Sequence, residues 1–173
     1  MGLIKIILKL KIIKMADYIE NKLIINCSDL IIKNKIKMLI FSEDDKKEQI
    51  FTMEKMIPRP EGFSDSVGYN EFGRDWSYAV WGTKWAQSYN ITESGDTIII
   101  DYQTPWVPNF FWVEALCRYI DSVSYKYKCD KEVSQNISVK HFYCDQYEDF
   151  GTEIDWTLDK GYSLIENVRM FER

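Results

Sequence analysis

The sequence of 173 residues predicts an α+β fold built on an antiparallel sheet. Short β-branched runs with alternating apolar and polar residues recur along the chain, and two stretches with apolar residues at helical spacing lie between them. The length suits one domain with its own core. We expect an N-terminal extension over 1–14, too short and too irregular in its lysine spacing for a membrane helix, and a single domain over 15–173.

The first elements are expected to be a strand and a helix. The run 21–27 is β-branched and flanked by polar residues, which is typical of a buried strand. Ser28 and Asp29 are candidate N-caps of a helix whose apolar residues recur at near-helical spacing up to Leu39. The charge run 42–49 that follows predicts a solvated loop.

The middle of the chain predicts a second strand, a loop, a short helix and a hairpin. Apolar and polar residues alternate over 51–60 until prolines end the pattern. The stretch 61–70 predicts a loop and begins an aromatic insertion at about 61–90, whose helix would close at Gly82 because glycine suits the left-handed residue that ends many helices. Two apolar runs within 86–104, separated by Ser-Gly-Asp, predict a hairpin.

The last part of the chain predicts a helix and strands. Apolar residues at helical spacing between Phe110 and Ile120, with a proline near the start, indicate the helix. Alternation predicts strands over 123–131, 136–144 and 151–158. The order strand, helix, strand, insertion, strand, helix, strand matches a ferredoxin-like split βαβ sandwich, an antiparallel sheet with helices on one face, here with an extra hairpin.

Composition narrows the classes of function. The formal net charge of -5 argues against a protein that coats duplex DNA or RNA, because such proteins bind phosphates through lysine and arginine. Four cysteines lie far apart and no secretion signal is recognisable, so we expect reduced thiols and an intracellular location. No membrane partner is expected.

Motifs for catalysis and metal binding are weak. No phosphate-binding loop or dinucleotide motif occurs, and His141, the only histidine, has no nucleophile motif beside it. His141 and Cys144 approach a zinc spacing, but residues three apart on a strand point to opposite faces. The carboxylates within 145–155 lack the spacing of a calcium loop and favour a solvated acidic loop. The prediction is no catalytic residue, no metal and no cofactor.

Two aromatic blocks, 81–85 (WGTKW) and 104–108 (TPWVP), are the best candidates for a binding site. Most tryptophans close a core, but arginine, lysine and threonine beside them suit a rim that holds a partner by stacking and charge. A tryptophan flanked by prolines is also held in a fixed pose. The candidate binding residues are Arg74, Trp81, Thr83, Lys84, Trp85, Thr104 and Trp106.

The same blocks resemble those of YubB-type proteins, a largely uncharacterised family of plasmids, phages and related elements with a ferredoxin-like domain. The family's Asn-Trp-Gly-Thr-Lys-Trp block stands here as 80–85, with Val80 in place of asparagine, and its Thr-Ala-Trp-x-Pro-Pro block as 104–108, with Pro105 in place of a small residue. The family's opening Pro-Asn-Trp-Cys is not retained. The resemblance covers about 17–132 and implies the fold and a viral or mobile-element source, with a place in the host cytoplasm or the virion, but no activity.

The leading hypothesis is therefore a non-enzymatic interaction module of a virus or mobile element, binding a host or viral protein through the two aromatic blocks. Single-stranded nucleic-acid binding is one alternative, because ferredoxin-like sheets can stack bases on aromatic side chains. An enzyme that acts on a small anionic substrate through Arg74, Lys84 and a carboxylate is the other.

Overall fold

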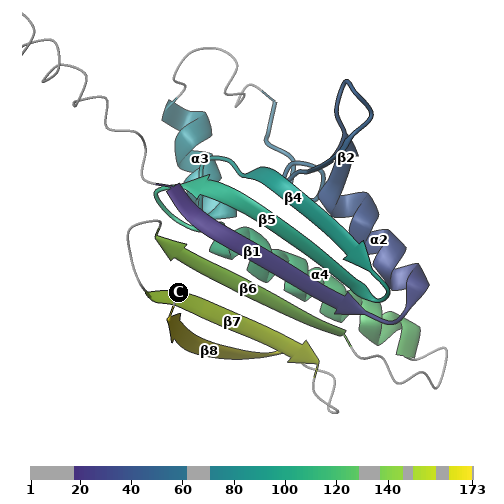
Figure 1. The fold of residues 1–173 in the computed structure, drawn as a ribbon. Helices are drawn as coiled ribbons and strands as arrows, with labels where there is room; N and C mark the ends of the chain where they lie inside the picture. The colour runs from purple at the N-terminus through teal and green to yellow at the C-terminus, as the bar shows by residue number, and fades with distance from the viewer. Residues whose placement is uncertain (1–17, 62–70, 129–136, 146–149, 159–163, 173) are drawn as a thin grey trace, which may run out of the picture.

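The computed structural model describes residues 18–61, 71–128, 137–145, 150–158 and 164–172, which form an α+β fold (Figure 1). The elements in chain order are β1 (Tyr18–Cys27), α2 (Leu30–Ile40), β2 (Phe41–Glu43), β3 (Gln49–Phe51), α3 (Glu71–Trp81), β4 (Gln87–Ser94), β5 (Thr97–Pro105), α4 (Phe110–Lys128), β6 (Ile137–Asp145), β7 (Phe150–Leu158) and β8 (Leu164–Glu172). The predicted α+β class is confirmed, and the predicted extension 1–14, residues 62–70 of the predicted loop 61–70, and Cys129 lie outside the described residues.

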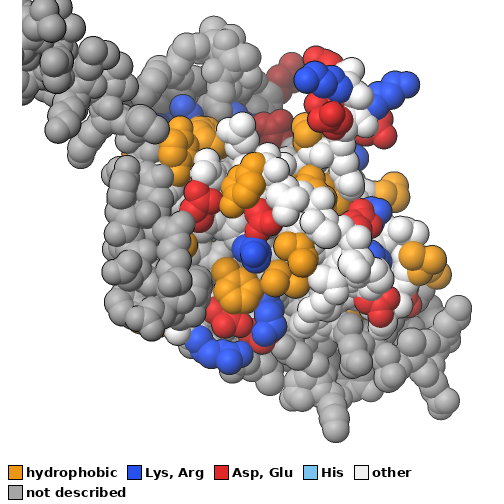
Figure 2. Space-filling model, in the orientation of Figure 1, with side chains coloured by type: hydrophobic (Ala, Val, Ile, Leu, Met, Phe, Trp, Pro, Cys, Tyr) orange, Lys and Arg blue, Asp and Glu red, His pale blue; other side chains and the backbone are white. Residues whose placement is uncertain are grey.

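Six strands form one antiparallel sheet in the order β4-β5-β1-β6-β7-β8, and β2 pairs with β3 in a separate hairpin. The central strand β1 alternates strictly, so that Leu23 and Ile25 enter the core while their neighbours face away from it. Figure 1 shows α4 running behind the sheet with α2 beside it. The opposite, open face carries apolar, acidic and basic side chains in close mixture (Figure 2).

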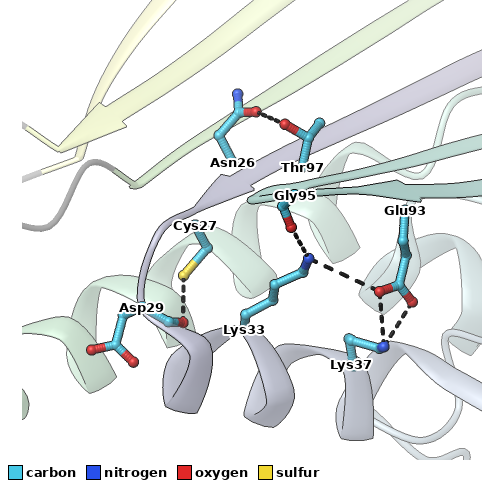
Figure 3. A network of polar contacts seen from close by, with 8 residues as sticks. All are labelled: Asn26, Cys27, Asp29, Lys33, Lys37, Glu93, Gly95 and Thr97. Carbon is cyan, nitrogen blue, oxygen red and sulfur yellow. Dashed lines mark hydrogen bonds and ion pairs between the residues drawn. The ribbon is translucent and has the colours of Figure 1, made fainter.

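The helix α2 begins where the sequence predicts. The Asp29 carboxylate accepts hydrogen bonds from the amides of Ile31 and Ile32 at 2.8 and 2.9 Å, which caps the helix, whereas Ser28 does not serve as the cap. Figure 3 shows how two lysines of α2 hold the β4–β5 hairpin: Lys33 donates to the Gly95 carbonyl at 2.6 Å, and Lys37 pairs with Glu93 at 2.7 Å.

The strand predicted over 51–60 is wrong beyond its first residue. Only Gln49–Phe51 pairs as β3, and the chain then turns, with the Ile57 amide bonded to the Met53 carbonyl at 3.1 Å. Two backbone carbonyls of this turn accept hydrogen bonds from buried indoles. Trp112 Nε1 donates to the Met53 carbonyl, and Trp81 Nε1 donates to the Ile57 carbonyl. Side chains from distant helices thus satisfy backbone groups that a ladder would otherwise use.

The strand predicted over 123–131 is also wrong where the structure describes it. The helix α4 continues through Lys128, since Leu116, Ile120 and the buried Ser124 extend one stripe at four-residue spacing. Beyond this helix β6 and β7 confirm the predicted strands, whereas β8 was not predicted. The sheet is larger than that of a simple ferredoxin fold because β7 and β8 extend it past β6.

Candidate interaction site

The two aromatic blocks meet in space at the junction of α3, β5 and α4. The Thr83 hydroxyl donates to the Pro105 carbonyl at 3.3 Å. Gly82 follows α3 with φ +85°, and a Cβ at this position would lie 3.1 Å from the Pro108 carbonyl oxygen and the Phe110 amide nitrogen. Only glycine fits both the backbone conformation and the close approach, so Gly82 sets how tightly the end of α3 meets the start of α4.

Trp106 occupies a turn that its own side chain disfavours. Its φ is +62°, and the Val107 amide donates to the Pro105 carbonyl at 2.7 Å, which makes a γ-turn centred on the tryptophan. A bulky residue with positive φ is an outlier. Nevertheless, Trp106 is 49% exposed, the next residue Val107 is 39% exposed, and Phe111 at the start of α4 is 50% exposed. We call these three residues the aromatic ridge.

A buried polar network holds the segment on both sides of this turn. Before it, the Thr104 hydroxyl accepts from Asn21 Nδ2 at 3.0 Å. After it, Asn109 Oδ1 accepts from the Tyr102 hydroxyl at 2.7 Å. His141 joins the two halves, because its Nε2 lies 3.0 Å from Asn21 Oδ1 and 3.2 Å from the Tyr102 oxygen. All five side chains are buried, so the hydrogen bonds form away from water.

The donors in this network fix the tautomer of His141. Asn21 uses its amide nitrogen toward Thr104 and the Ile19 carbonyl, and the Tyr102 proton goes to Asn109, so both neighbours of the imidazole offer acceptors. Nε2 therefore carries the proton, and Nδ1 is a bare nitrogen without a hydrogen-bond partner among the described residues. Burial lowers the pKa of His141 to about 3, so the imidazole is neutral at physiological pH.

The other predicted site residues lie mostly inside. Trp81, Thr83 and Thr104 are buried, so their side chains support the site in this conformation and do not form its outer surface. Trp85 is half-buried with its ring centroid 5.9 Å from that of Tyr18. Arg74 is paired with its neighbour Asp75 at 3.3 Å.

One cation that the sequence reasoning missed lies against the first block. The guanidinium of Arg59 stands 4.6 Å from the centroid of the Trp81 ring, and it donates to the Lys84 carbonyl at 2.9 Å. The Pro-Arg-Pro stretch 58–60 was the available signal, since prolines fix the backbone around the arginine. A cation thus lies over the face of Trp81, and it comes from a residue that was not among the predicted site residues.

Within the described ranges, no cluster of histidine, cysteine or carboxylate side chains suits a metal ion. Among the described residues, Cys27, Cys117 and Cys144 form no disulfide. Two carboxylates of the predicted acidic loop instead lie on β7, where Glu153 and Asp155 pair with Lys140 at 3.3 and 3.2 Å. None of the described helices combines the length and apolar character that crossing a bilayer requires.

Comparison of the chain with protein-family models, with curated proteins and with solved structures finds no match in any of the three.

Proposed function

We propose that this protein is a non-enzymatic interaction module that binds a partner protein by inserting Trp106 into an apolar pocket of that partner. Val107 and Phe111 complete the contact as the rest of the aromatic ridge. The observation that carries the proposal is the combination of a positive φ with a half-exposed indole at Trp106.

The backbone conformation of Trp106 has a free-energy cost that glycine would avoid. Residues held in such regions cost on the order of 1–3 kcal/mol each and cluster at functional sites. Half of the Trp106 surface remains in water, so burial stabilises this residue much less than it stabilises the enclosed Trp81 or Trp112. A function that needs an exposed indole at this point accounts for the retained cost.

The turn also suits an aromatic contact because it is held before binding. The Pro105 carbonyl accepts from both Val107 and Thr83, and the network at Thr104 and Asn109 holds the flanking residues. A side chain that is already ordered loses little entropy on binding. Tryptophan is also among the residues most enriched at the energetic centres of protein interfaces.

The fold and origin belong to the same proposal. The order β4-β5-β1-β6, with α2 between β1 and β4 and α4 between β5 and β6, supports a ferredoxin-like split βαβ core. The meeting of the two aromatic blocks supports kinship with YubB-type proteins, because the residues that carry the resemblance work together. A viral or mobile-element source and an intracellular partner follow from that kinship.

Single-stranded nucleic-acid binding is favoured less by the geometry. The open face does carry the aromatic residues Tyr89 and Phe142, but the carboxylates of Glu20 and Asp101 stand among them and would repel the phosphates of a bound strand. An enzyme that uses Arg74 and Lys84 is also favoured less, since Arg74 is paired with Asp75.

The test uses three baits: the native chain, Trp106→Gly and Met38→Ala. The proteins that each bait captures from the cells in which this protein occurs are compared. Met38 is an exposed apolar residue of α2 and serves as the matched control. We expect a partner whose affinity falls by about 30-fold or more for Trp106→Gly, as for an interface hot spot, and is unchanged for Met38→Ala. Capture that is equal for all three baits contradicts the proposal, and capture that nuclease abolishes favours the nucleic-acid alternative.

A further inference from the structure

A hollow of about 540 Å³ opens on the face of the sheet opposite the helices. Four adjacent strands line it, and Figure 2 shows apolar, acidic and basic side chains close together on this face. Its lining includes Glu20, Lys22 and Ile24 of β1, Tyr89 of β4, Asp101 of β5 and Phe142 of β6. No residue of the aromatic ridge contributes, so the hollow is a second and separate feature.

A β-bulge builds the wall of this hollow. The register of β4 against β5 shifts between Ser88 and Asn90, which leaves Tyr89 as an extra residue. Bulges of this kind re-aim a side chain. The Tyr89 hydroxyl reaches across β5 to donate to Glu20 Oε2 on β1 at 3.0 Å. Burial and this hydrogen bond to Glu20 raise the pKa of Tyr89 to about 12, so the phenol keeps its proton at neutral pH.

The charges in the hollow leave one carboxylate available. Asp101 is paired with Lys22 at 3.4 Å and also accepts from Asn90 at 2.8 Å. Glu20 accepts from Tyr89 and from Gln103 Nε2, at 3.0 and 2.6 Å, and both of these donors are neutral. The three charged side chains of the lining therefore sum to one negative charge, located at Glu20. A carboxylate has more acceptor positions than these two hydrogen bonds occupy.

We propose that this hollow binds a small organic monocation with an apolar body, such as an aryl amidinium or an alkylammonium. The charged end would lie at the Glu20 carboxylate, beside the Tyr89 phenol that donates to it. The apolar body would cover Ile24 and Phe142. A concave, largely apolar surface with a few converging polar groups is the usual form of a small-molecule site.

Three probes of nearly the same shape test the charge requirement in the native chain. Benzamidine is a cation, benzamide is neutral and benzoate is an anion. Each is titrated into the ¹⁵N-labelled full-length protein, and backbone amide shifts are followed by NMR. We expect saturable shifts on β1, β5 and β6 with benzamidine, affinity weaker by about five-fold or more with benzamide, and no binding of benzoate.

Two charge variants then change the affinity in opposite directions. Glu20→Gln should weaken benzamidine binding by about five-fold, and Lys22→Gln should strengthen it, because the first removes the attracting charge and the second removes a competing cation. Glu114→Gln, which makes the same chemical change on the exposed side of α4, should have no effect. Shifts that never saturate, equal affinity for benzamidine and benzamide, or weaker binding by Lys22→Gln would each overturn the proposal.

Discussion

Protonation of the buried His141 should make the protein unstable in mild acid. Its pKa is about 3 in the folded chain and 6.5 as an unperturbed side chain, so the unfolded state binds a proton in a pH range where the folded state does not. Stability is therefore complete above about pH 6.5 and is lost progressively as the pH falls toward 3. Between about pH 7.5 and about pH 5 the free energy of unfolding should fall by about 2 kcal/mol through this residue.

Urea unfolding at these two pH values, for the native chain and for His141→Gln, isolates that contribution. Glutamine keeps an N–H that can donate to Asn21 but does not titrate, and the chain holds no second histidine. The loss of stability between the two pH values should be smaller in the variant by about 2 kcal/mol, whatever its stability at neutral pH. Equal losses would refute the assignment, as would an NMR titration in which the imidazole C2 proton of the folded protein shifts near pH 6.5.

Three further predictions concern local backbone structure. Gly82→Ala should destabilise the protein by about 2 kcal/mol or more, whereas Gly95→Ala, with positive φ but open space around it, should cost only about 1 kcal/mol; thermal unfolding of both variants compares them. Trp106→Gly should be more stable than Trp106→Ala by about 1 kcal/mol, because glycine removes the backbone strain, and the reverse order would show that the turn is unstrained. Asp29→Ala should lose about 1 kcal/mol of stability and Asp29→Asn much less, since asparagine also caps helices. Equal losses would show that the Asp29 cap does not stabilise α2.

Local sequence patterns were sufficient to predict the elements whose ends are marked by residues close to them. Asp29 marks the start of α2, Gly82 marks the end of α3, and the Ser-Gly-Asp turn joins β4 to β5, each at its predicted place. These signals act within a few residues, so sequence alone displays them. The predictions failed where the local structure depends on groups that are distant in the sequence. The turn after β3 depends on the indole of Trp112, fifty-nine positions away from the carbonyl that it binds.

In the candidate site, too, some features are indicated by neighbouring residues and others depend on residues distant in the sequence. The prolines on both sides of Trp106 indicated a restricted segment, but they did not predict the positive φ that the structure has at this residue. Most of the tryptophans were expected in the core, but which of them would be enclosed, as Trp81 is beside Thr83, could not be predicted, since it depends on how α3 packs against the start of α4. His141 and Asn21 are 120 positions apart, and neither residue type indicates that the other will be its hydrogen-bond partner.

The buried network explains how a strained turn persists in this protein. Apolar packing is not directional, so it would hold the core without fixing the residues on either side of Trp106. Hydrogen bonds are directional, and those at Thr104 and Asn109 fix the chain just before and just after the turn. His141 links the two ends through Asn21 and Tyr102. A proton on His141 Nδ1 would place an unpaired charge at the centre of this network. The residue that makes the fold acid-sensitive is thus also the one that joins both supports of the exposed tryptophan.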